Sequence, residues 1–273
     1  MTAGRHALLG IEDGLATITL NRPDARNALS EEMRADLDDH LAVIKAEAGN
    51  SVRAVLLTGA GRSFCAGGDV KAMGNRSGDD SAAGRRTRLR SSHHRFYDLL
   101  HVEVPVIAAV NGHAAGAGFA LALMADFLIA GPSTRFACSF GRIGLVPDWG
   151  CMYTLPRVVG LQKAKDLIFT GRTIDAEEAR AMGVVHEIAP TDEGLVDHAA
   201  GFARRFCDAS THAIGVAKTV LNQSYETDHR TLIELEAFGQ GVSYETSYHA
   251  DAVARFRDKR PAAFDWERSS KGE

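Results

Sequence analysis

The chain has 273 residues, which is enough for one large domain or for a domain with a smaller appendage. Its formal net charge is −4 at pH 7 with acidic and basic residues interspersed, so nucleic acid is not an expected partner. The four cysteines have no CxxC spacing and the longest apolar stretches, 104–110 and 117–130, are too short or too interrupted to span a membrane, so we expect a reduced, cytoplasmic protein.

The N-terminal part of the chain begins with a predicted strand at 16–20, followed by a stretch dense in turn formers at 21–27. Ser30 is placed to cap a helix, and the acidic residues that follow it suit the positive end of the helix dipole. One face of that helix is apolar. It carries Met33, Leu37, Leu41 and Ile44.

Two apolar segments are each followed by a glycine-rich loop. A strand is predicted at 52–58 and the first loop at 59–68. A second strand is predicted at 104–110 and the second loop at 111–118, after which a buried apolar segment continues to residue 130. Strands that alternate with loops and helices indicate an α/β fold with a largely parallel sheet.

The remaining elements are mostly helical. The small polar residues of 74–86 predict a mobile loop, and 88–101 is predicted to form a helix. One further helix is expected to stop at Gly171, and another begins at the Asp175–Glu178 capping pattern. From about residue 201 onward only helical patterning is visible, so we expect a core over 1–200 and a helical region over 201–273.

The two glycine-rich loops are candidates for binding a negative charge. Backbone N–H groups where a strand turns into a helix are fixed donors, and glycine and alanine let a ligand approach them closely. Simple turn formation explains either loop taken alone. Neither loop has the G-x-G-x-x-G or the G-x-x-x-x-G-K spacing of a nucleotide-binding loop, and no metal-ligand spacing occurs, so no bound metal is expected.

Several segments together resemble the crotonase, or enoyl-CoA hydratase/isomerase, superfamily. They span nearly the whole chain in the family's order. The segments are LNRPDARNAL (20–29), GRSFCAGGDVKAM (61–73), PVIAAVNGHAAGAGFALALMADFLIA (105–130), FGRIGLVPDWG (140–150), LPRVVG (155–160), AEEARAMGVVHEI (176–188) and RDKRPAAF (257–264).

The resemblance implies a spiral of ββα units with a C-terminal helical trimerisation region, and hence a homotrimer or a dimer of trimers. It also implies that a thioester oxygen sits between two backbone N–H groups, and the matching residues here are Gly68 and Ala117. The second of these positions is commonly glycine in the family, and alanine still supplies the amide. Two such donors favour a thioester enolate.

Hydratases of this family use two glutamates, and both are missing here. The matching positions carry Ala120 and Phe140, which neither hold nor deprotonate a water. Asp148 stands where isomerases of the ring-opened phenylacetate type, and some dehalogenases, carry a catalytic aspartate. Its Pro-Asp-x-Gly context is also a good β-turn, and an aspartate there can cap the next helix instead.

The resemblance further implies that coenzyme A is bound as part of the substrate, with no permanently bound cofactor. Its contacts are expected near the two loops. The coenzyme candidates are Arg26, Ala28, Ala66, Asp69 and Lys71, and the candidates for the acyl pocket are His113, Ala120, Phe140 and Trp149. The adjacent residues His93 and His94 point in different directions on a helix and are not expected to bind one ion together.

The leading expectation is an acyl-CoA enzyme that moves a double bond or opens a ring, with Asp148 as the base. One alternative is a CoA-thioester dehalogenase or hydrolase on the same scaffold, with Asp148 as the nucleophile. Another is a catalytically degenerate subunit that binds acyl-CoA and turns over nothing.

Overall fold

The computed structural model describes residues 5–69 and 81–269. Within them, six strands form one sheet in the order β1-β2-β3-β4-β6-β9, and three form a second sheet in the order β5-β7-β8. The strands of the first sheet are Ala7–Glu12 (β1), Leu15–Leu20 (β2), Ala54–Gly59 (β3), Val106–Val110 (β4), Phe127–Ala130 (β6) and Glu187–Ile188 (β9). Those of the second sheet are His113–Ala115 (β5), Arg135–Ala137 (β7) and Thr173–Asp175 (β8).

Most neighbouring strands run parallel, as predicted. Only β1–β2 and β7–β8 are antiparallel among the strands described. The helices of the core are Glu31–Glu47 (α1), Ala82–His101 (α3), Ala117–Ala122 (α4), Cys151–Val159 (α5), Leu161–Thr170 (α6), Ala176–Ala181 (α7) and Leu195–Arg204 (α8), with short 3-10 helices at Pro23–Ala25 (η1) and Ser139–Ile143 (η2). The later helices are Thr211–Leu221 (α9), His229–Tyr244 (α10), Ser247–Arg257 (α11) and Trp266–Ser269 (α12).

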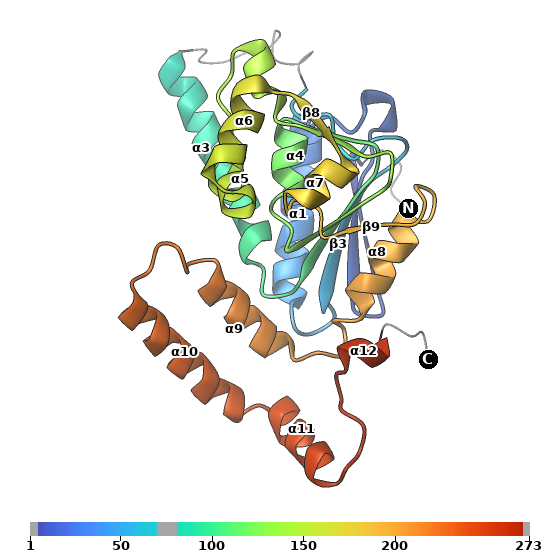
Figure 1. Ribbon diagram of the computed structural model, residues 1–273, viewed down its shortest axis with the longest axis vertical. Coiled ribbons are helices and arrows are strands. Elements are labelled where there is room, and N and C mark those ends of the chain that lie inside the picture. The colour runs from blue at the N-terminus through green and yellow to red at the C-terminus, as the bar shows by residue number, and fades with distance from the viewer. Residues whose placement is uncertain (1–4, 70–80, 270–273) are drawn as a thin grey trace.

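Alternation along the central strands builds two apolar layers. Val55 and Leu57 of β3 point into the main core, where helix α1 contributes Met33 and Leu37. The neighbouring Leu56 points to the opposite face, which α8 covers. A strand that is buried on both faces is a continuous run of apolar residues, and this run is why the sequence predicts a strand at β3. Figure 1 shows α8 and α1 on opposite sides of the sheet.

The helix ends follow the signals in the sequence. The Ser30 hydroxyl accepts a hydrogen bond from the Met33 N–H at the start of α1, and the Asp175 carboxylate accepts one from the Glu178 N–H at the start of α7. Helix α6 ends at Gly171, which has a φ of 57°. A left-handed residue at this place favours glycine, so the predicted stop is confirmed.

The structure differs from the sequence-based expectations in three places. Of the predicted loop 74–86, residues 82–86 belong to helix α3, which Ser81 caps by accepting a hydrogen bond from the Gly84 N–H; residues 74–80 lie outside the described part of the chain. The alanines and arginines there are good helix formers, and this outweighs the polar composition. Strand β1 was missed, because its alternation is weak. The apolar segment 119–130 divides into the end of α4 and strand β6.

The C-terminal helices α9, α10 and α11 form an arm that extends beyond one end of the sheet (Figure 1). Helices α10 and α11 contain no buried residue in this single chain. Helix α8 lies on the core and runs through residue 200, where the sequence suggested a boundary. Among the residues described, no helix combines the length and the apolar character needed to cross a bilayer.

Candidate active site

The two glycine-rich loops lie against each other. The Cys65 N–H donates to the His113 carbonyl at 3.0 Å, and the Ala115 N–H donates to the Cys65 carbonyl at 3.0 Å. A Cβ on Gly67, whose φ is 95°, would come 2.7 Å from the Ala115 oxygen, and one on Gly118 would come 2.3 Å from the Cys65 oxygen. Only glycine permits so close an approach, so these residues decide that the loops meet.

This packing brings Gly68 and Ala117 to one pocket. Ala117 is the first residue of α4, so its N–H has no acceptor within the helix. No described residue accepts a hydrogen bond from either the Gly68 or the Ala117 N–H. Both amides are therefore placed to donate to a ligand, as expected for a site that binds a thioester oxygen.

The pocket has a cavity volume of about 90 Å³ and combines apolar walls with a few polar side chains. The described residues that line it are Arg34, Ala66, Gly67, Gly68, Gly116, Ala117, Ser139, Phe140, Ile143, Leu145, Asp148 and Trp149. Three of them carry polar side chains, and these come from α1, from η2 and from the turn before α5. Apolar pockets with a few convergent polar groups are the common form of a small-molecule site.

Asp148 opens a tight turn at the pocket. The Cys151 N–H donates to the Asp148 carbonyl at 3.0 Å, and the two central residues, Trp149 and Gly150, have φ values of 55° and 72°. Positive φ is unfavourable for a bulky aromatic residue, and such conformations concentrate at functional sites. Gly150 is the N-cap of α5. The predicted turn is confirmed.

The predicted acyl-pocket residues fall into two groups. Phe140 and Trp149 line the pocket and are 8% and 2% exposed. Ala120 is fully buried inside α4, and His113 is exposed on β5; neither is among the lining residues. Of the four predicted residues, the aromatic pair thus lines this pocket, and the role of all four in binding an acyl group stays a prediction.

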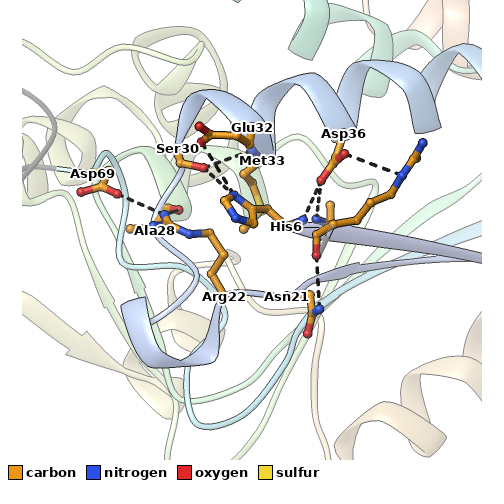
Figure 2. A network of polar contacts seen from close by, with 11 residues as sticks. His6, Asn21, Arg22, Ala28, Ser30, Glu32, Met33, Asp36 and Asp69 are labelled. Carbon is orange, nitrogen blue, oxygen red and sulfur yellow. Dashed lines mark hydrogen bonds and ion pairs between the residues drawn. The ribbon is translucent and has the colours of Figure 1, made fainter. Parts of the chain in front are cut away.

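Four of the five predicted coenzyme residues lie in the described part of the chain, and each already makes a hydrogen bond within the protein. The Arg22 Nη1 donates to the Ala28 carbonyl at 2.7 Å and to the Asp69 carboxylate at 3.1 Å, as Figure 2 shows. The Ala66 N–H donates to the Arg26 carbonyl at 2.9 Å, and the Arg26 side chain is exposed. The Arg22 side chain thus links the segment at Ala28 to Asp69 at the end of the first loop. The sequence did not indicate this role. Lys71 lies outside the described residues.

Sequence reasoning missed Arg34, Ser139, Ile143 and Leu145. Arg34 lies one helical turn before the buried Leu37, at the edge of the apolar face, and its Cζ lies over the Trp149 ring at 5.5 Å from the centroid. Helical periodicity places it near the core, but it gives no sign of what the helix faces. The side chains of His93 and His94, on α3, lie outside the described part of the structure.

Two buried cysteines, Cys138 and Cys151, flank a segment that lines the pocket. The Cys138 Sγ lies 3.6 Å from the Cys151 Sγ, and the chain between them contributes half of the residues that line the pocket. Burial raises the pKa of the Cys65 thiol, beneath the first loop, to about 12. The Cys65 thiol is therefore protonated at neutral pH, which suits packing and not nucleophilic catalysis.

Comparison with known proteins places this fold and site in one family. Residues 10–268 match the family model described as enoyl-CoA hydratase/isomerase. The solved enoyl-CoA hydratase/isomerase of Cupriavidus metallidurans superposes with a TM-score of 0.90 at 35% identity, covering 97% of each chain. The chain belongs to the enoyl-CoA hydratase/isomerase family and has the crotonase fold.

Individual relatives differ in their named reaction. The chain is 37% identical to 1,2-epoxyphenylacetyl-CoA isomerase of Escherichia coli over 259 residues, covering 93% of this chain and 96% of the relative. It is 34% identical to the short-chain-enoyl-CoA hydratase of Clostridium acetobutylicum over 256 residues, covering 93% and 95%. The family is thus defined, and the reaction depends on the side chains in the pocket.

Proposed function

We propose that this protein is a CoA-thioester isomerase that moves a double bond or opens a ring through a thioester enolate. The observation that carries the proposal is that Asp148 lines the same pocket as Gly68 and Ala117. The similarity to an epoxyphenylacetyl-CoA isomerase over nearly the full length of both chains supports the same reading.

In the proposed reaction, the thioester carbonyl oxygen accepts hydrogen bonds from the Gly68 and Ala117 N–H groups. The Asp148 carboxylate removes a proton from a carbon of the acyl group, and the electron pair of that C–H bond moves toward the carbonyl oxygen to give the enolate. The protonated Asp148 then returns the proton to a different carbon. No atom is gained or lost, so the product is an isomer of the substrate.

Hydration is the competing reaction, because several relatives are named hydratases. The pocket argues against it, since Ala120 lies outside the lining and Phe140 places an aromatic ring there. In the dehalogenase or hydrolase alternative Asp148 acts as the nucleophile, and the aromatic rings of Phe140 and Trp149 hold an aromatic substrate. In the remaining alternative the pocket binds acyl-CoA without turnover.

One experiment separates these reactions. The purified protein is mixed with a panel of enoyl-, dienoyl- and aromatic CoA thioesters, and the products are followed by mass and by double-bond absorbance. Isomerisation changes the absorbance at constant mass, hydration adds the mass of one water, and hydrolysis releases free coenzyme A. Products that gain water or lose coenzyme A would overturn the isomerase proposal, and the absence of any turnover would favour a binding subunit.

We also propose that the protein assembles as a homotrimer or as a dimer of trimers. The support is the C-terminal arm, whose apolar side chains have no core of their own. Phe238 of α10 and Phe256 of α11 are 71% and 85% exposed in the single chain. Large exposed apolar groups on a helical arm are typical of a subunit interface.

A further inference from the structure

Arg34 is the one cationic side chain among the described residues that line the pocket. It is the fourth residue of α1, and the rotation of that helix is fixed by its buried neighbours Met33 and Leu37. The guanidinium lies over the Trp149 ring, with its Cζ 5.5 Å from the ring centroid. A cation–π contact of this kind favours this position of the guanidinium, so the charge belongs to the pocket wall.

Arg34 shares the pocket with the first glycine-rich loop. Burial raises the pKa of the Cys65 thiol, and the Arg34 cation is among the groups that oppose this rise. Cys65 precedes Ala66, Gly67 and Gly68, which line the pocket from the first loop. Arg34, Trp149 and the loop that supplies a proposed thioester donor thus line the same pocket.

A guanidinium in this position makes hydrocarbon a poor ligand. It carries five N–H donors and keeps its charge at all accessible pH values, so it can contact the protein and still donate to a ligand. An aliphatic chain that displaces water from these N–H groups breaks their hydrogen bonds to water and forms none. An oxygen acceptor in the ligand replaces the lost hydrogen bond. Sites built around placed donors reject analogues that lack the matching acceptor.

We infer that Arg34 determines substrate choice, selecting acyl groups that carry an oxygen acceptor over acyl groups that are plain hydrocarbon. The inference rests on the proposed function, because it assumes that the acyl part of a CoA thioester occupies this pocket. Ser139 adds a hydroxyl to the same wall, next to Gly116, where an added Cβ would lie 3.3 Å from the Ser139 Oγ. Both polar groups thus belong to a pocket that distinguishes among acyl groups.

The test compares matched saturated thioesters, which bind without reacting. The probes are pentanoyl-CoA against 4-oxopentanoyl-CoA, and hexanoyl-CoA against 5-oxohexanoyl-CoA, measured by titration calorimetry. A ketone accepts hydrogen bonds and cannot donate one to Asp148, so the comparison isolates the acceptor. We expect the wild-type protein to bind the oxo compound about 10-fold more tightly at one chain length or both, as a charge-assisted hydrogen bond allows.

Arg34→Met keeps the length of the side chain and removes its charge and donors. It should bring the ratio of the two dissociation constants close to one, mainly through weaker binding of the oxo compound. Arg34→Lys should retain part of the preference. Lys45→Met, on the same helix but paired with Asp98 outside the pocket, should leave the ratio unchanged. Circular dichroism and the Tm of each variant establish that it folds.

Two results would overturn the inference while leaving the proposed function intact. One is a ratio near one in the wild-type protein at both chain lengths. The other is an equal loss of affinity for both compounds in Arg34→Met, which would assign Arg34 to coenzyme binding or to the fold. Failure of the wild-type protein to bind any of the four thioesters would overturn the proposed function and the inference together.

Discussion

The Lys218 ammonium lies 2.7 Å from the Asp126 carboxylate, and this ion pair attaches helix α9 to the start of strand β4. Lys218 is 7% exposed and also donates to the Val104 carbonyl at 3.1 Å, while the Val106 N–H donates to Asp126. Burial lowers the pKa of Lys218 and raises that of Asp126, and their mutual attraction opposes both shifts.

We expect Lys218→Ala to lower the free energy of unfolding by roughly 3–5 kcal/mol, because it leaves the Asp126 carboxylate buried without its cation. The double variant Lys218→Met with Asp126→Asn should recover part of this loss, since the amide is neutral. Urea unfolding measures both, with the exposed Lys163→Ala as the control. An effect of Lys218→Ala no larger than that of the control would show that the pair does not hold the arm on the core.

Asp148→Asn should keep the turn and the shape of the pocket but remove the proposed base. Turnover of an identified substrate should fall by about 10²–10⁴, the usual contribution of a general acid–base group, with the dissociation constant of the CoA thioester nearly unchanged. Steady-state kinetics and calorimetry check the two parts separately. Turnover at the wild-type rate would reduce Asp148 to a turn residue and leave the isomerase proposal without its base.

Gly68→Pro should behave differently from Asp148→Asn. Proline removes the backbone N–H and distorts the loop that carries it. Both binding and turnover should therefore suffer, whereas the carboxylate variant affects turnover alone. The same two measurements apply, and unchanged binding of the CoA thioester by Gly68→Pro would argue against a role for this amide.

Hydration of crotonyl-CoA should be negligible. The two family glutamate positions hold Ala120, which is fully buried, and Phe140, which faces the pocket with an aromatic ring. Each missing acid–base group is typically worth about 10²–10⁴ in rate. Loss of the enoyl absorbance measures hydration directly. Water addition at the rate of a two-glutamate enzyme would mean that another carboxylate in the pocket positions the water.

The C-terminal arm should mediate assembly. Light scattering at micromolar concentration is expected to give the mass of a trimer or hexamer, and Phe238→Asp or Phe256→Asp should shift the mass toward that of the monomer. Phe169→Asp is the matched control, because Phe169 is 77% exposed but lies on α6 and not on the arm. A wild-type protein that stays monomeric would refute the proposed assembly.

Cys65 should make the protein sensitive to alkali. Its pKa is raised to about 12 by burial, whereas an exposed thiol has a pKa of about 8.5. The stabilisation from the protonated thiol is complete below about pH 8.5 and is lost as the pH rises toward 12, because only the unfolded chain releases the proton in this window. Between pH 8 and pH 10 the loss is about 2 kcal/mol.

Cys65→Ala should remove this share of the pH dependence while costing some stability at pH 8. Urea unfolding at the two pH values measures the difference, and Cys207→Ala, which removes a less buried thiol, should change it less. The same pH dependence in Cys65→Ala and in the wild-type protein would contradict the assignment.

The sequence by itself determined the features that depend on near neighbours. The caps at Ser30 and Asp175, the stop at Gly171 and the buried character of β3 each follow from residues within a turn or two along the chain. The resemblance of dispersed segments added the family, and it identified Asp148 as the carboxylate to examine.

Tertiary structure decided which residues share the pocket. Gly67 meets Ala115, and Arg34 meets Trp149, only because strands and helices far apart in the chain pack together. Local patterns did not indicate that Ala120 lies outside the pocket lining or that Arg22 occupies the Ala28 carbonyl and the Asp69 carboxylate. Periodicity shows which face of a helix is buried, but long-range packing decides which residues that face contacts. Long-range packing therefore placed the Arg34 guanidinium in the pocket.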